Sequence, residues 1–175
     1  NLEITRGERI AILGPNGSGK STLLRLITGQ EKQMGGTIKI GEHNVKMAYF
    51  EQNQAEALDL NKSVLDTIYD QVPDWKTDEV RGLLGRFLFT GDSVYKQVGS
   101  LSGGEKGRLA LAKMLLDANN FLILDEPTAV LTPQEVDDLF IILKKMAADG
   151  HALIFISHKL HEVLAISQRV TVLRD

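Results

Sequence analysis

The chain has 175 residues, 43% of them hydrophobic and 25% charged, so it is long enough to bury a core within one domain. Its formal net charge of -3 excludes the overall basic field of a nucleic-acid-binding protein, and we expect no direct DNA binding. The absence of cysteine excludes disulfides and thiolate metal sites. Because neither a signal peptide nor an apolar run of roughly 18 residues is visible, we expect a cytoplasmic protein with no transmembrane segment.

Apolar runs and helical periodicity predict strands that alternate with helices. Along the chain we predict strands at Leu2–Thr5, Arg9–Leu13, Gly36–Ile40, Lys46–Phe50, Phe121–Leu124, Ala152–Ile156 and Arg169–Leu173. We predict helices from about Gly19 to Gly29, and at Ser63–Gln71, Asp78–Leu88, Lys106–Leu116 and Pro133–Asp149. Thr132 and Glu135 form a capping box at the start of the last helix, and Gly150 ends it.

This order of elements predicts an α/β fold with a mainly parallel sheet. The middle of the chain differs, because strand signals are weak between about Ala55 and Leu116 and helical patterns dominate there. We therefore predict an α/β core made of residues 1–54 and 117–175, with a helical subdomain inserted at residues 55–116.

A glycine-rich loop lies between the predicted strand at 9–13 and the helix that follows it. Its sequence, GPNGSGKST, matches the pattern G-x-x-x-x-G-K-[ST], whose backbone N–H groups and helix N-terminus hold phosphates. We expect Lys20 to reach the β- and γ-phosphates and the Ser21 hydroxyl to ligate Mg²⁺. The alternative is a glycine-rich turn without a ligand, and the loop alone does not distinguish ATPases from GTPases or kinases. The predicted phosphate-binding residues are Gly14, Asn16, Gly17, Ser18, Gly19, Lys20, Ser21 and Thr22.

Two carboxylates, Asp125 and Glu126, follow the apolar run Phe121–Leu124. The buried strand would deliver them at its carboxyl end, where ligand sites of α/β sheets lie. We expect Asp125 to hold Mg²⁺ directly or through water, and Glu126 to polarise the attacking water. The alternative is a strand end whose solvated acids cap the next turn.

The segment Leu101–Glu105, LSGGE, precedes the predicted helix at 106–116. Its serine and two glycines present a hydroxyl and N–H groups at a helix N-terminus, which is an anion site, although Ser102 and Glu105 can also form a capping box without a ligand. With this segment, the sequence resembles the ATP-binding cassette (ABC) superfamily, whose signature is LSGGQ or LSGGE, over essentially the whole chain. The resemblance implies a RecA-like P-loop NTPase core, an ABC-type helical subdomain and hydrolysis of ATP with Mg²⁺.

The resemblance also implies a site shared between two domains, because the signature binds the γ-phosphate held by a second ABC domain. That second domain would be a homodimer partner or a fused one. Gln52 matches the Q-loop glutamine, which touches Mg²⁺ and the water, and His158 matches the switch histidine, which contacts the γ-phosphate. The implied trans residues are Ser102, Gly103, Gly104 and Glu105. The implied catalytic residues are Glu126, His158, Lys20 and Gln52, and the implied metal ligands are Ser21, Gln52 and Asp125.

The sequence departs from the family in three places. The family stacks adenine on an upstream aromatic residue, but the thirteen residues before Gly14 contain none, so adenine contacts are not identified. Thr132 stands where the family has the D-loop aspartate, which couples the two sites across the dimer. The chain also stops soon after the predicted strand Arg169–Leu173, earlier than most family members.

Two parts of the chain resemble different branches of the family. Up to about Leu124, the stretches YFEQNQ (49–54), LGRFLF (84–89) and LSGGEKGRLALAK (101–113) are similar to ABC-F proteins, the ribosome-associated branch. From there to Asp175, the stretches DEPTAVLTPQEV (125–136) and ISHKLHEV (156–163) are similar to sugar or nucleoside importer ATPases. We hypothesise a chimera joined near Asp125–Thr128, with an unusual natural sequence as the alternative. Three functions then remain: a translation-type ABC-F ATPase, a transporter motor domain acting through membrane partners, or a truncated or engineered chimeric domain that binds nucleotide with little turnover.

Overall fold

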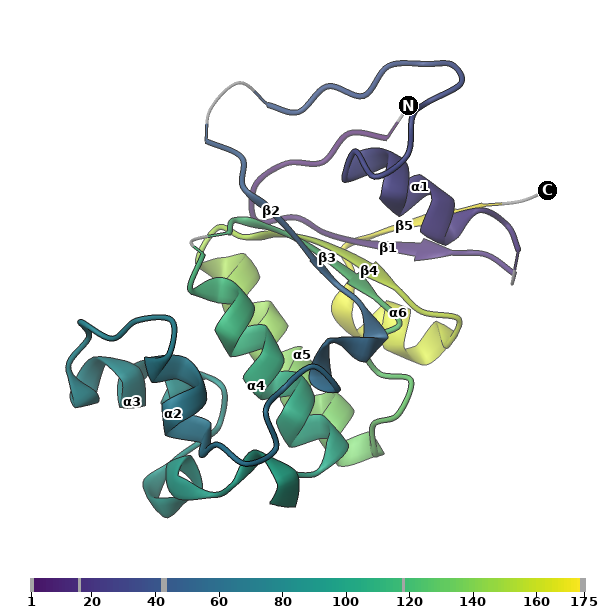
Figure 1. Cartoon of the computed structure of the whole chain (residues 1–175). Coiled ribbons are helices and arrows are strands. Elements are labelled where there is room, and N and C mark those ends of the chain that lie inside the picture. The colour runs from purple at the N-terminus through teal and green to yellow at the C-terminus, as the bar shows by residue number, and fades with distance from the viewer. Residues whose placement is uncertain (1, 16, 42–43, 118, 174–175) are drawn as a thin grey trace. The chain divides into compact units, whose positions relative to one another are not determined.

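The central element of the computed structural model is a parallel sheet of five strands in the order β2-β3-β4-β1-β5 (Figure 1). The structure describes residues 2–15, 17–41, 44–117 and 119–173, with the side chains of residues 52 and 53 excepted. The strands are β1 (Arg9–Leu13), β2 (Met47–Phe50), β3 (Phe121–Asp125), β4 (Ala152–Ile156) and β5 (Arg169–Val172). The predicted fold class, α/β with a mainly parallel sheet, is confirmed.

The chain divides into two compact units. The first unit comprises Asn1–Glu51, Asn119–Pro127 and Leu143–Asp175, and it holds the whole sheet. The second unit comprises Gln52–Ala118 and Thr128–Ile142. Helix α5 (Pro133–Ala148) contributes residues to both units.

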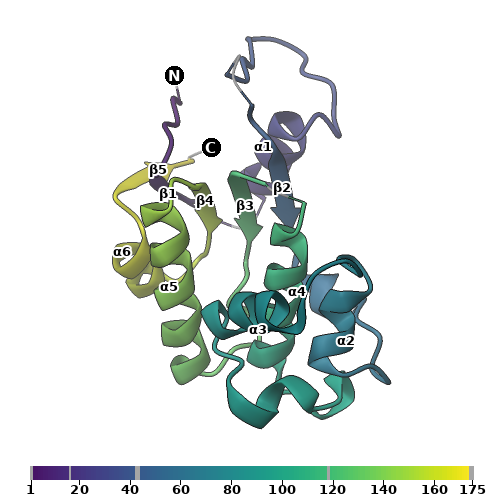
Figure 2. The ribbon, with the colours of Figure 1, turned by 90° about the vertical axis from the view of Figure 1, so that its left-hand side faces the viewer.

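The first unit covers both faces of its sheet with helices, which explains why its central strands are apolar at nearly every position. Helix α1 (Lys20–Ile27) lies on one face and α6 (Leu160–Ile166) on the other (Figures 1 and 2). On the α1 face, Leu24 packs in a fully buried cluster with Ile12, Ile123, Ile154 and Ile156. All five residues of β4 are buried, as expected for a strand inside a covered sheet.

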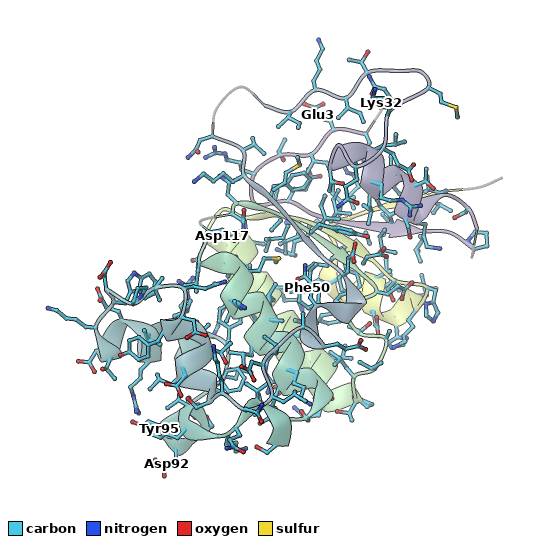
Figure 3. The ribbon with its side chains drawn as sticks, viewed as in Figure 1. Glu3, Lys32, Phe50, Asp92, Tyr95 and Asp117 are labelled. Atoms are coloured by element: carbon cyan, nitrogen blue, oxygen red, sulfur yellow. The ribbon has the colours of Figure 1, made fainter. Side chains whose placement is uncertain are left out.

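The second unit is built from helices and short turns (Figure 2). Its elements are the helices α2 (Val64–Tyr69), α3 (Thr77–Arg86) and α4 (Gly103–Leu115), and the 3₁₀ turns η1 (Gln52–Ala55), η2 (Gly91–Tyr95) and η3 (Val98–Ser100). Val80, Leu84 and Leu109 are fully buried in it, whereas Tyr95 is 56% exposed (Figure 3). The subdomain boundaries at residues 55 and 116 stay a prediction.

Two strand predictions are wrong, because neither Leu2–Thr5 nor Gly36–Ile40 forms a strand. Thr5 instead closes a turn, in which its backbone N–H donates to Glu8 Oε2 and its carbonyl accepts from the Glu8 N–H. Alternation of apolar and polar residues marks a segment suited to a sheet face, but a strand also needs a neighbouring strand to pair with. The opposite error occurs at α6, which was not predicted because its seven residues show too little periodicity.

Candidate functional site

The carboxyl ends of the parallel strands place three predicted motifs at one edge of the sheet in the first unit. The glycine-rich loop follows β1, Asp125 and Glu126 stand at the end of β3, and His158 comes two residues after β4. A cavity of about 280 Å³ lies at this edge. Its lining residues are Gly17, Gly19, Lys20, Ser21, Thr22, Asp125 and Glu126. The phosphate loop and the acidic pair therefore face one space, as the sequence predicts.

The phosphate loop forms a tight turn whose shape depends on its glycines and on Lys20. Gly17 and Gly19 both have φ of 86°, a conformation that favours glycine. A Cβ added at Gly14 would come within 2.4 Å of Ser18 Oγ, so the turn is closed to larger side chains there. Lys20 is only 8% exposed, and its Nζ donates to the carbonyls of Gly14 (2.8 Å) and Pro15 (2.9 Å).

Ser18 Oγ supports the same interpretation of the loop, because it is buried and has no hydrogen-bond partner among the residues that the structure describes. A buried hydroxyl without a partner is costly, and a phosphate oxygen is an acceptor that would satisfy it. Asn16, which we also predicted to bind phosphate, lies outside the described residues.

The carboxylate of Asp125 is held by two hydroxyl groups that donate to the same oxygen. Its Oδ2 accepts from Ser21 Oγ at 3.3 Å and from the Tyr49 hydroxyl at 2.9 Å. Tyr49 pairs with Ile123 in the sheet, and Asp125 follows two residues later on the same face. Burial, and then the hydrogen bond to Asp125, hold the pKa of the Tyr49 phenol far above its ordinary value, so this residue stays a proton donor.

Glu126 and His158 form a pair at the same edge. His158 Nδ1 lies 3.0 Å from Glu126 Oε2 and 3.2 Å from Oε1, and because a carboxylate only accepts, Nδ1 is assigned as the donor. The backbone of Glu126 has φ of 49°, a left-handed conformation that is uncommon for a residue with a side chain. Its N–H donates to the carbonyl of Ile156 at 3.1 Å, which ties the end of β3 to the end of β4.

The turn that carries His158 is anchored by a buried serine. Ser157 is fully buried, and its hydroxyl donates to Glu162 Oε2 at 2.8 Å and accepts from the Lys159 N–H at 3.1 Å. The Lys159 ammonium lies 3.0 Å from Glu162 Oε1, so the buried carboxylate is paired. These contacts restrict the backbone on both sides of the histidine.

The predicted capping box at the start of α4 is present in the second unit. Ser102 Oγ accepts from the Glu105 N–H at 3.1 Å, and Glu105 Oε2 accepts from the Ser102 N–H at 2.9 Å. The Ser102 hydroxyl also donates to Glu135 Oε1 at 2.5 Å. This bond, followed by those from Thr132 and from the Gly104 N–H, holds the pKa of Glu135 below its ordinary value.

Two residues in these contacts were not assigned a site role from the sequence. Tyr49 was predicted only as part of the strand Lys46–Phe50, and Glu135 only as a capping residue. Tyr49 lies on the strand beside β3, with its side chain on the same face of the sheet as that of Asp125, but the sequence does not show which strands are neighbours. No local pattern links Glu135 to Ser102. The side chain of Gln52, predicted to touch Mg²⁺, lies outside the described residues.

The donor set at the cavity suits magnesium held together with a nucleotide. Within the described residues, no group of three or more His, Asp or Glu side chains is arranged to hold a metal by itself. Ser21 and Asp125 are joined by a hydrogen bond and would supply two oxygen ligands. Magnesium usually takes one or two protein ligands and completes its shell with phosphate oxygens and water, so the residues fit this ion.

Comparison with known proteins defines the class. A sequence model of the family described as ABC transporter matches residues 1–129. ABC transporter F family member 5 of Arabidopsis thaliana is 57% identical over 128 residues, which are 73% of this chain and 18% of that protein. F family member 2 of the same plant is 46% identical over 175 residues, which are 100% of this chain and 25% of that protein. The solved structure of cbiO1 from Clostridium perfringens, part of the ABC transporter complex cbiONQ, shares 30% identity with a TM-score of 0.84, over 99% of this chain and 76% of that one.

The chain therefore belongs to the ABC transporter family, whose ATPase domains are P-loop ATP hydrolases that bind ATP. The predicted class, an ABC-type ATPase domain with relatives in the F family, is confirmed, and the alternative of a domain with little turnover is not favoured. The chain spans about a quarter or less of the length of the two plant relatives.

Two further expectations can be compared with these findings. The chimera hypothesis is not confirmed, because one F family relative aligns with the whole chain, including the proposed junction at Asp125–Thr128. In the part of the chain that the structure describes, no helix is long and apolar enough to cross a membrane.

Proposed function

We propose that this domain binds MgATP at the phosphate loop of its first unit and hydrolyses it against the signature segment of a second ABC domain. The observation that carries the proposal is the cavity at the sheet edge, where Lys20, Ser21, Asp125 and Glu126 converge. These four side chains divide three tasks of phosphoryl transfer among them. Lys20 neutralises charge, Ser21 and Asp125 ligate the metal, and Glu126 activates water.

Phosphate binding is assigned to the loop and to Lys20. The backbone N–H groups between Gly14 and Thr22 surround the phosphates, and the hydroxyl of Ser18 donates to a phosphate oxygen. Lys20 exchanges its two carbonyl acceptors for the β- and γ-phosphates. Ser21 and Asp125 hold Mg²⁺, and Tyr49 orients Asp125 by occupying its Oδ2.

Catalysis is assigned to the pair at the ends of β3 and β4. Glu126 is the general base that takes a proton from the attacking water, and the hydrogen bond from His158 Nδ1 restricts its carboxylate. The contact of His158 with the γ-phosphate and the role of Gln52 at the metal and the water follow from the family resemblance and remain part of the proposal.

Closure of the site is assigned to a second domain. The phosphate loop belongs to the first unit and the signature to the second. The family resemblance assigns the signature to the nucleotide of a partner. Ser102, Gly103 and Gly104 would donate to the γ-phosphate held by that partner, with Glu105 capping the helix behind them. A head-to-tail pair then has two equivalent sites, and loss of the γ-phosphate on hydrolysis separates it.

For the whole protein, we propose a translation-type ATPase of the F branch that acts on the ribosome. This is supported by F family relatives, one of which aligns with the full chain at 46% identity. The second candidate is the motor domain of a transporter, and the 30% identity with cbiO1 supports it. Co-sedimentation with purified ribosomes in the presence of MgATP distinguishes the two.

The proposed reaction is tested with Glu126→Gln, which keeps the shape of the side chain but removes the base. This variant should bind MgATP, hydrolyse it at least about a hundredfold more slowly, and accumulate as a dimer in light scattering. Adding Ser102→Arg should abolish the dimer while ATP binding by the monomer persists. If Glu126→Gln stays monomeric at high protein concentration with ATP demonstrably bound, the shared-site mechanism is wrong for this chain.

A further inference from the structure

The anion site of the signature segment already contains a carboxylate from the same unit. Glu135 Oε1 accepts from the Ser102 hydroxyl at 2.5 Å and from the Gly104 N–H at 3.2 Å. Both donors lie in the first turn of α4, a helix of thirteen residues. In the proposed function, these same two groups donate hydrogen bonds to the γ-phosphate held by the partner.

The fit between Glu135 and the start of α4 is close. A Cβ added at Gly104 would lie 2.4 Å from the carboxyl carbon of Glu135 and 2.7 Å from its Cβ. The absence of a side chain at position 104 therefore lets the glutamate reach the helix N-terminus. An anion at this position gains from the helix dipole and from unpaired N–H groups. A negative charge thus satisfies the signature site without a nucleotide.

The second oxygen of the same carboxylate serves a different helix. Glu135 Oε2 accepts from the Thr132 N–H at 2.9 Å, and Thr132 Oγ1 accepts from the Glu135 N–H at 3.4 Å, which completes the capping box of α5. Oε1 can therefore leave Ser102 and Gly104 while the cap of α5 is kept. Since Glu135 is only partly buried, its side chain has room to withdraw.

We propose that Glu135 is a positioning residue of the signature site. Its carboxylate binds the Ser102 hydroxyl and the Gly104 N–H in place of a phosphate until the second domain brings its ATP. The inference rests on the proposed function, because it concerns the same trans contact. The carboxylate and the γ-phosphate cannot both occupy these donors, since both are anionic. Glu135 thereby keeps the site formed in the absence of a partner and lowers the affinity of the domain for a second copy.

The test uses Glu135→Gln in the Glu126→Gln background. Glutamine keeps the length of the side chain and can complete the capping box, but it removes the charge. A neutral acceptor holds the two donors more weakly than a carboxylate, so the dissociation constant of the MgATP-bound dimer should fall by about tenfold or more. Asp137→Asn is the matched control, because it removes the same charge from an exposed position of α5.

A second measurement separates this role from a merely structural one. In the chain with Glu126 intact, Glu135→Gln should lower the protein concentration that gives half-maximal ATPase activity, while the MgATP affinity of the monomer stays the same. If the Glu126→Gln parent dimerises and the added Glu135→Gln leaves the dissociation constant of the dimer equal or raises it, the role of Glu135 is overturned and the proposed function stays intact. If neither chain dimerises with ATP bound, the proposed function fails and the inference fails with it.

Discussion

Replacement of Lys20 by alanine tests the phosphate loop directly. Lys20 is 8% exposed and its Nζ makes two hydrogen bonds, both to carbonyl groups of the loop. If the loop binds phosphate, the ammonium group exchanges these neutral acceptors for phosphate oxygens when MgATP arrives. The alanine variant has no side chain that can make this exchange, so its affinity for MgATP should fall.

The size of the effect follows from that exchange. The exchange replaces bonds from the ammonium to neutral carbonyls with bonds to anionic phosphate oxygens, so each replaced acceptor should gain roughly 1–2 kcal/mol. Two exchanges contribute roughly 2–4 kcal/mol in total, which corresponds to about a 30- to 700-fold weaker dissociation constant for Lys20→Ala. AMP, which lacks the β- and γ-phosphates, should bind both chains equally.

Titration calorimetry with MgATP, MgADP and AMP measures the three affinities. Lys46→Ala is the matched control, since it removes the same charge from an exposed side chain of the first unit. Among the described residues, the hydrogen bonds of Lys46 are made by its backbone. An MgATP affinity of Lys20→Ala within about twofold of the parent, in a folded protein, would show that this loop does not hold the phosphates.

Three further predictions concern the binding of Mg²⁺, the choice between adenine and guanine nucleotides, and stability in acid. Tyr49→Phe should raise the Mg²⁺ concentration for half-maximal ATPase activity roughly threefold to tenfold, because Asp125 loses one of the two donors that the described residues give it. Tyr69→Phe, which removes a hydroxyl that bonds to Thr77, should have no effect. Equal Mg²⁺ curves for Tyr49→Phe and the parent would contradict the assignment. Among the described residues that line the phosphate cavity none is aromatic, so this chain should bind ATP and GTP within about tenfold, whereas strong preference for ATP in a competition assay would reveal an adenine pocket elsewhere. Because the pKa of Glu135 is lowered in the folded state, its hydrogen bonds stabilise the fold at pH values above the ordinary pKa of 4.5, and this stability is lost as pH falls through the lowered pKa. In urea unfolding as pH falls below 4.5, the free energy of unfolding of Glu135→Gln should therefore depend less on pH than that of the parent. Identical pH dependence of the two free energies would count against the contact.

Local interactions of this protein could be predicted from its sequence. The apolar runs at Phe121–Leu124 and Ala152–Ile156 mark buried strands, because a strand covered on both faces needs apolar side chains at every position. The capping boxes at Ser102 and Thr132 involve residues only three positions apart, so their spacing alone predicts them. The phosphate loop is likewise a contiguous segment whose glycines and lysine define its chemistry.

Pairing between distant segments was decided only by the tertiary structure. The segments Leu2–Thr5 and Gly36–Ile40 have strand-like patterns but no paired neighbour in the sheet, and a pattern does not show whether a partner is present. Tyr49 reaches Asp125 across 76 positions of the chain, and Ser102 reaches Glu135 across 33. The register of β2 against β3 and the packing of α4 with the start of α5 create these hydrogen bonds. Since register and packing depend on the whole fold, no local arrangement of residues encodes them.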